Sequence, residues 1–332
     1  SEPMACRGCA AKLPAQPLAA ALEQAGLSGP PEDAARIEGD PPLLQSVDGF
    51  PALVSDPWLN GRLTTLHACS DLWACGVRVD SAQAIVTLPV LEAAEQQELL
   101  VQTLCGVRSV LEEQQAQLIG GHTLESRSEP PHCPSLGVQL SLCVNGRSAA
   151  PWSKGGIAHG DVLLLSRPLG TGVLFAAAMA GACQPEALDT VLQHMSRSQH
   201  RLLDQLEPHR QAIHACTDVT GFGLLGHLGE MLASSSPLRI TLWTNRIPAY
   251  PEAMDRLAQG YASSLAPANR RSWQWLDEPI QLDQPPSQAL LELLVDPQTC
   301  GPLLLACPET TGQALTAEGP WIQIGSAAAE RD

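Results

Sequence analysis

The chain contains two stretches in which strand and helix patterns alternate, and a short glycine-rich segment separates them. This segment covers residues 146–160 (GRSAAPWSKGGIAHG), and its small, polar composition is typical of a domain boundary. With 332 residues, 44% of them apolar, the chain is long enough to build a core on each side of that boundary. Since each half mixes strands with helices, we expect an α/β (α+β) protein of two domains, each organised around one sheet.

The spacing of apolar residues predicts the elements within each half. In the first half we expect helices over residues 15–26, 60–75 and 91–116, extended structure over 43–55, and strands over 82–89, over a short run ending at the glycine pair 120–121, and over 136–146. In the second half we expect a strand, a turn and a helix within 161–182, helices over 185–207, 221–234, 251–260 and 286–294, and strands over 238–244, 301–307 and 321–327.

The charge of the chain excludes two classes of partner. Its formal net charge is −16, from 35 acidic and 19 basic residues, whereas surfaces for nucleic acid or anionic membranes need the opposite sign. A polyanionic ligand such as a nucleotide would therefore need divalent cations to screen the contact.

The cysteine pattern indicates a reducing compartment. Eleven cysteines are spread along the chain without a compact disulfide framework, which favours free thiols and a cytoplasmic protein. No apolar run approaches the roughly 18 residues that a membrane span needs. We therefore expect no membrane partner.

The segment Thr217-Asp-Val-Thr-Gly-Phe-Gly-Leu-Leu-Gly-His227 places a carboxylate where an extended segment turns through glycines into an apolar helix. One interpretation is an ion or phosphate site, because glycines let a ligand approach the backbone and a helix start offers free N–H groups. The other is an ordinary helix cap made by Asp218 or Thr220. This segment alone leaves both open.

Four aspartates lie where a strand or turn meets an apolar element: Asp33, Asp48, Asp71 and Asp218. Acidic residues are seldom placed in apolar surroundings unless they are paired or bound to a cation. Any one of them taken alone is most simply a turn or cap residue. If they converge, however, hard oxygen ligands of this kind suit Mg²⁺ together with substrate phosphates.

The N-terminal run Cys6-Arg-Gly-Cys9-Ala-Ala-Lys12 has three interpretations. It could be half of a zinc site, although no second pair at ligand spacing exists, or a thiol activated by the neighbouring ammonium, or an ordinary chain terminus. The usual phosphate-loop and dinucleotide motifs are absent from the sequence. The glycine pair before His122 and the turn Gly170-Thr-Gly172 are weak phosphate signals.

A set of motifs spread over nearly the whole chain resembles the selenophosphate synthetase (selenide, water dikinase) family. They are Cys9-x-x-Lys12, Glu32-Asp-Ala-Ala35, Ser46-Val-Asp48, Gly61-Arg62, Ala68-Cys-Ser-Asp71 followed by Ala74 and Gly76, Gly120-Gly-His-Thr123, Arg167-Pro-Leu-Gly-Thr-Gly172, Thr217 to His227, and Asp296-Pro-Gln-Thr-Cys-Gly301. Each motif is weak alone, but the set in this order is specific.

The resemblance implies a two-domain fold like that of aminoimidazole ribonucleotide synthetase. It divides the chain into an N-terminal catalytic arm (1–40), an ATP-binding and dimerisation domain (41–150) and a C-terminal α/β domain (151–332). The N-terminal sheets of a homodimer would pair into a barrel. The implied reaction converts ATP, selenide and water into selenophosphate, AMP and orthophosphate, with Mg²⁺ and a monovalent cation such as K⁺.

The resemblance also implies roles for individual residues. Catalysis falls to Cys9, which handles selenide, and to Lys12, on an arm that would close over the nucleotide and exclude water. The implied metal ligands are Asp33, Asp71 and Asp218. The implied nucleotide-binding residues are Lys12, Glu32, Asp48, Asp71, Gly120, Gly121 and His122, the last three in a loop that would reach the nucleotide of its own or of the partner subunit.

The chain departs from the family pattern at several positions. Glu32 stands where the family has Asp, His67 stands in place of an Asn close to the nucleotide, and Thr299-Cys-Gly-Pro302 replaces Thr-Ser-Gly-Gly. The stretch before Cys9 is short, consistent with a piece of a fusion to a flavin-dependent dehydrogenase-like domain. Two alternatives remain: another ATP-dependent small-molecule kinase or synthetase of this fold, and a catalytically weak selenium-binding paralogue.

Overall fold

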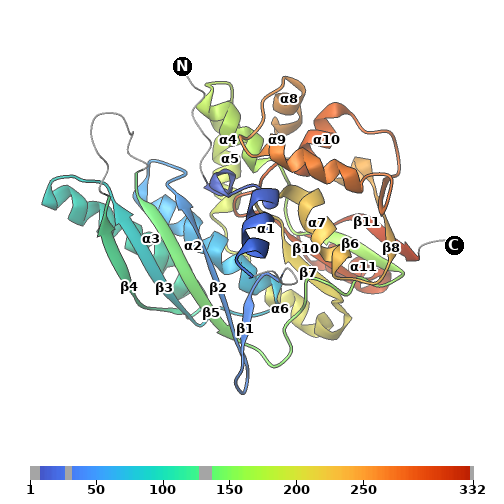
Figure 1. Ribbon diagram of the computed structural model, residues 1–332, viewed down its shortest axis with the longest axis horizontal. Coiled ribbons are helices and arrows are strands. Elements are labelled where there is room, and N and C mark those ends of the chain that lie inside the picture. The colour runs from blue at the N-terminus through green and yellow to red at the C-terminus, as the bar shows by residue number, and fades with distance from the viewer. Residues whose placement is uncertain (1–7, 27–31, 127–136, 330–332) are drawn as a thin grey trace.

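The protein contains two sheets, one from each half of the chain (Figure 1). The structure, a computed structural model, describes residues 8–26, 32–126 and 137–329, without the side chains of Cys9 and Ala10. The first sheet has the order β1-β2-β5-β3-β4 and comprises β1 (Ala35–Ile37), β2 (Leu43–Pro51), β3 (Ser81–Leu88), β4 (Gln117–Glu125) and β5 (Gln139–Arg147). The second has the order β7-β10-β6-β11-β8-β9 and comprises β6 (Asp161–Leu165), β7 (Ala215–Asp218), β8 (Leu238–Leu242), β9 (Ile280–Leu282), β10 (Leu303–Pro308) and β11 (Ile322–Ala329).

Two helices cover one face of the first sheet: α2 (Pro57–Ala74) and α3 (Ala93–Glu113). Helix α2 begins after Asp56, whose carboxylate accepts the backbone N–H of Leu59 and so caps the first turn. From Asn60 onward nearly every residue of α2 is buried, because the helix contacts the first sheet and α3 as well as β7 and β10 of the second sheet. Close packing of α2 on α3 depends on Gly61 and Gly106, since a Cβ at either would overlap backbone of the other helix.

The opposite face of the first sheet carries exposed apolar side chains. Val47 on β2, Ile85 on β3 and Ile119 on β4 are 67%, 51% and 59% exposed. All nine residues of the edge strand β4 are exposed. The short strand expected to end at the glycine pair 120–121 continues to Glu125, so the loop expected at 120–123 is part of β4.

The second sheet is surrounded by the remaining helices. These are α4 (Thr171–Met179), α5 (Pro185–Met195), α6 (Leu202–Leu206), α7 (Gly223–Ala233), α8 (Ala253–Ala258), α9 (Ala266–Asn269), α10 (Gln288–Val295) and α11 (Glu309–Glu318), with 3-10 turns η2 (Glu207–Ala212), η3 (Thr244–Arg246) and η4 (Arg270–Trp275). All five residues of the central strand β6 are buried, as expected for a strand covered on both faces.

The N-terminal arm forms η1 (Gly8–Ala11) and α1 (Ala15–Gln24). None of the residues of α1 is buried, and Gln16 accepts a hydrogen bond from Arg271 on η4. Helix α1 therefore contacts the C-terminal domain through side chains that stay exposed, while η1 contacts β2 of the first sheet. Within the described ranges, no helix combines the length and the apolar character needed to cross a membrane.

One expected helix differs from the structure, and one helix was not expected. The helix expected over 185–207 is interrupted between α5 and α6, where Arg62 binds the carbonyl of Ser196 and Arg167 binds that of Arg197. These tertiary contacts take carbonyl groups that a continuous helix would use internally. Helix α11 was not expected, because its residues show no clear apolar stripe.

Candidate functional site

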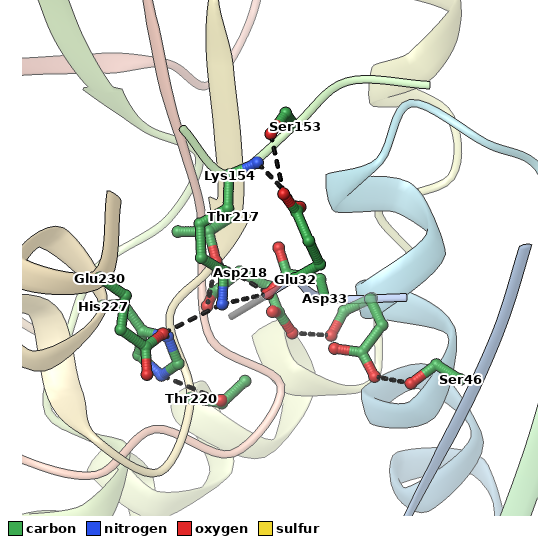
Figure 2. Close-up of polar contacts among 12 residues, drawn as sticks. Glu32, Asp33, Ser46, Ser153, Lys154, Thr217, Asp218, Thr220, His227 and Glu230 are labelled. Carbon is green, nitrogen blue, oxygen red and sulfur yellow. Dashed lines mark hydrogen bonds and ion pairs between the residues drawn. The ribbon is translucent and has the colours of Figure 1, made fainter. Parts of the chain in front are cut away.

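Three carboxylates from distant parts of the chain meet at the junction of the two domains. Asp33 precedes β1, Asp71 lies on α2, and Asp218 ends β7. One oxygen of each lies within 4.8 Å of the others. Figure 2 labels Asp33 and Asp218, which lie close together near the centre of the view. Convergence of this kind is what the interpretation as a metal site required, and what isolated turn or cap residues would not produce.

Hydroxyl groups hold the carboxylates in place. Ser46 on β2 donates to Asp71 at 2.5 Å, and Thr217 donates to Asp33 at 3.1 Å. Ser70 on α2 donates to Asp218 and so connects the two domains directly. These hydroxyl groups therefore fix the orientation of the three carboxylates without neutralising their charge.

The electrostatics of the cluster favour a bound cation. Burial raises the pKa of Asp33 to about 7, with Lys154 opposing and Asp218 adding to the shift. Burial and the charges of Asp218, Asp48 and Asp33 raise the pKa of Asp71 well above its usual value. Several buried carboxylates at this distance resist simultaneous ionisation unless a cation joins them. Hard oxygen donors suit Mg²⁺, so these residues fit the predicted ion.

A buried lysine lies beside the cluster (Figure 2). The Nζ of Lys154 lies 2.6 Å from Asp33 and 3.0 Å from Glu230, and the side chains of Lys154 and Asp33 are each 5% exposed. Burial opposes its charge, but the two carboxylates raise the pKa of Lys154 above its usual value. Burial likewise raises the pKa of Glu230, yet His227 and Lys154 outweigh it and lower the value to about 2. The lysine therefore stays protonated and offsets part of the negative charge of the cluster.

Asp218 is not a helix cap. Helix α7 begins at Gly223 after Phe222, which makes no side-chain capping bond. The glycines of this motif serve packing: a Cβ at Gly226 would lie 2.7 Å from Cβ of Phe222, and Gly223 has a left-handed φ of 70° beside the backbone of Val295. Helix α7 also begins at Gly223, two residues after the start expected at residue 221.

Asp48 on β2 is held by His67 on α2. Nδ1 of His67 accepts the backbone N–H of Cys300 at 3.1 Å, so this nitrogen carries no proton. Nε2 therefore carries the proton and points to Asp48 at 3.1 Å. Burial raises the pKa of Asp48, but His67, Lys12 and the N–H of Gly49 together lower it below its usual value. Asp48 stays ionised and remains 32% exposed.

The arm brings Lys12 to the same junction. A Cβ at Gly8 would lie 2.8 Å from Oγ1 of Thr299, and the ammonium of Lys12 lies 4.8 Å from the centre of the Phe222 ring. The backbone of Cys9 forms part of η1, but its side chain lies outside the described residues. Its predicted catalytic role therefore stays a prediction.

The remaining predicted nucleotide-binding residues are Glu32, Gly120, Gly121 and His122. The carboxylate of Glu32 accepts from Oγ of Ser153 at 3.0 Å and from the backbone N–H of Lys154 at 3.3 Å (Figure 2). Gly120, Gly121 and His122 lie on β4, at the opposite edge of the first sheet from β1. A Cβ at Gly121 would overlap the carbonyl of Ala84, so this glycine permits the close β3–β4 pairing.

The sequence did not predict that Lys154, Glu230 and His227 lie together in one group. His227 Nε2 lies 3.2 Å from Oγ1 of Thr220, and its Nδ1 lies 3.4 Å from Glu230 without forming a hydrogen bond. Lys154 belongs to the segment interpreted as a domain boundary, where a single lysine gives no signal.

Comparisons with known proteins agree with this architecture. Residues 31–142 match the family model for the AIR synthase related protein, N-terminal domain, and residues 158–331 match that for the C-terminal domain. The chain belongs to the AIR synthase related family. A selenide, water dikinase from Desulfitobacterium hafniense (strain Y51) is 33% identical over 284 residues, 85% of this chain and 78% of the relative. Another from Nitratidesulfovibrio vulgaris (strain DP4) is 34% identical over 283 residues, 83% and 76% of the two chains.

These relatives confirm the predicted resemblance and identify an ATP-dependent phosphotransferase. The solved structure of AaThiL complexed with AMPPCP and TMP superposes with a TM-score of 0.70 at 17% identity, covering 96% of this chain and 92% of that one. This likeness confirms the predicted two-domain fold.

Proposed function

We propose that the protein is a selenophosphate synthetase, which converts ATP, selenide and water into selenophosphate, AMP and orthophosphate with Mg²⁺. The main support is the convergence of Asp33, Asp71 and Asp218 within 4.8 Å, in a chain related to selenide, water dikinases. Phosphoryl transfer from ATP depends mostly on positioning and on neutralising the phosphate charge.

Each residue at the junction has a role in this proposal. Mg²⁺ held by the three carboxylates would neutralise phosphate charge that this acidic protein cannot neutralise with its own surface. Lys12 adds a positive charge from the arm, and Cys9 on the same turn handles selenide. Asp48 binds the nucleotide, oriented by the N–H of His67.

Phosphorus NMR tests the reaction directly. The protein is incubated anaerobically with ATP, Mg²⁺, K⁺ and selenide, and we expect selenophosphate, AMP and orthophosphate in equal amounts. ADP alone would indicate another kinase of this fold, and turnover indifferent to selenide would contradict the proposal. No turnover under any of these conditions would favour the selenium-binding paralogue.

The metal role has a separate test with a matched control. Asp218→Asn should abolish turnover and weaken Mg-ATP binding measured by calorimetry, because it removes one ligand and its charge. Asp189→Asn, on the exposed side of α5, should leave both unchanged. Equal Mg-ATP affinity in the two variants would remove the metal role from Asp218.

We further propose a homodimer in which the first sheets of two copies form a barrel. Support comes from the exposed apolar side chains of β2, β3 and β4, which a monomer would leave in water. In such a dimer Gly120, Gly121 and His122 would approach the partner's nucleotide. Ile119→Asp should then shift the mass measured by light scattering towards the monomer, whereas Val101→Asp, 48% exposed on α3, should not.

Two assignments complete the proposal. K⁺ as the monovalent cation rests on the family resemblance, and turnover in KCl compared with NaCl measures it. A cytoplasmic location agrees with the eight cysteines whose side chains the structure describes, all of which carry free thiols.

A further inference from the structure

A cavity of about 390 Å³ lies on the C-terminal domain, outside the carboxylate cluster. It is formed where the turn after β6, the segment between α5 and α6, and the start of β11 meet. Its lining includes Arg167, Arg197 and His194 and contains no acidic residue. A cationic cavity is unexpected in a chain with a net charge of −16.

The charge of the two arginines is not neutralised by the protein. Arg167 donates to the carbonyl of Cys300 at 2.9 Å and to that of Arg197 at 3.1 Å. These bonds use two of the five N–H donors of its guanidinium. Across residues 8–26, 32–126 and 137–329, neither arginine forms an ion pair with a carboxylate. Arg197 is exposed, whereas Arg167 is partly buried, and a partly buried cation normally has an anionic partner.

A buried hydroxyl beside Arg167 also has no partner. Tyr250 is 2% exposed, and its hydroxyl makes no hydrogen bond to any described residue. Burial raises the pKa of Tyr250 to about 12, although Arg167 opposes the shift. The Tyr250 ring packs edge-on against His194, with 5.7 Å between the ring centres. Tyr250 does not belong to the lining of the cavity, so it supports the site through the packing of its ring on His194.

His194 senses the positive charge of the cavity. Burial, Arg197 and Arg167 lower its pKa, in that order. The rest of the lining includes apolar side chains from Pro168, Leu202, Pro320 and Ile322. The cavity thus combines a charged end with an apolar wall, and it has more room than one phosphate ion occupies.

We propose that this cavity is a second ligand site, which binds the phosphate group of a small phosphomonoester through Arg167 and Arg197. The guanidinium groups donate to the phosphate oxygens, since planar donors of this type suit phosphate. The organic part lies against the apolar wall. Free orthophosphate presents the same group and binds by the same contacts.

Proton NMR of the histidine ring tests this site. Metal-free protein is titrated with inorganic phosphate and, separately, with ribose 5-phosphate, with chloride at matched ionic strength as the control. His194→Asn identifies the His194 signal among the nine histidines of the chain. We expect a saturable shift and a raised pKa of His194 with either phosphate, and tighter binding of ribose 5-phosphate if the ester is the natural ligand class.

Two arginine variants separate a built site from general attraction of anions. Arg197→Gln should weaken binding by about tenfold or more, as expected for the loss of a charge-assisted hydrogen bond. Arg201→Gln, an exposed arginine just outside the lining, should leave it unchanged. Arg167→Gln is less suitable, because it also removes two backbone contacts. Chloride shifts equal to those with phosphate, the absence of saturation, or equal weakening in the two variants would overturn the proposal.

Discussion

The pH dependence of stability should reveal the crowding of carboxylates at the junction. In the metal-free protein the pKa of Asp33 rises from its ordinary 3.8 to about 7 on folding. Between these values the folded protein holds a proton that the unfolded chain has lost, so stability falls as pH rises from about 4 to about 7. Each pH unit well inside this range contributes about 1.4 kcal/mol; because Asp33 is half ionised at pH 7, the change from pH 5 to pH 7 is about 2.3 kcal/mol.

Asp33→Asn isolates this contribution. The amide cannot ionise, and it resembles the protonated acid in shape. Below pH 4 the variant and the natural protein should therefore differ little, while above pH 7 the variant should be more stable by roughly 4 kcal/mol. Urea unfolding in EDTA at half-unit pH steps measures the difference, with Asp189→Asn as the control for other titrating groups.

Added Mg²⁺ should act in the opposite direction and stabilise the natural protein more than Asp33→Asn. An ion bound by the carboxylates favours their charged forms, so the natural protein gains stability at pH 8 and the variant gains less. Parallel pH curves for Asp33→Asn and the natural protein in EDTA would refute the reasoning, because they would mean that Asp33 is ionised in the metal-free fold throughout this range.

Two further substitutions test the packing around the junction. Gly106→Ala should lower the free energy of unfolding by about 1–3 kcal/mol, because its Cβ would overlap the carbonyl of Trp58. Gly120→Ala should cost less, because the nearest neighbour of its Cβ is 3.9 Å away. Urea unfolding compares the two variants, and equal losses of stability would contradict the packing argument. His67→Leu should cost about 1–3 kcal/mol in the same assay, since it leaves the buried N–H of Cys300 without an acceptor, and an unchanged midpoint would show that this contact does not stabilise the domain junction.

Local patterns in the sequence predicted most of the elements. Helix α2 and strands β3, β5 and β6 follow from apolar spacing, because each buries a regular set of side chains. The break after α5 did not follow, since it depends on arginines that come from distant parts of the chain. The extension of β4 beyond its glycine pair was missed for a related reason: it depends on pairing with β3, which local sequence does not show.

The candidate site was predictable only in part. Asp33, Asp71 and Asp218 could be named because motifs and a family resemblance marked them, although 185 residues separate the first from the last. Lys154 could not, because its importance comes from two carboxylates that only the folded chain brings to it. Sequence motifs identify the residues that bind ligands more readily than they identify the residues that balance the charge of those ligand-binding residues.

The exposure of the Cys300 thiol depends on whether the two domains are in contact. Its N–H is held by His67, its carbonyl by Arg167, and its thiol lies 3.2 Å from the carbonyl of Leu63, with the residue only 3% exposed. Because His67 and Leu63 belong to the first domain and Arg167 to the second, the domains cannot part without uncovering this sulfur. The rate at which an alkylating reagent labels Cys300 would therefore time the opening of the molecule, and ligands that bridge the two domains would slow it.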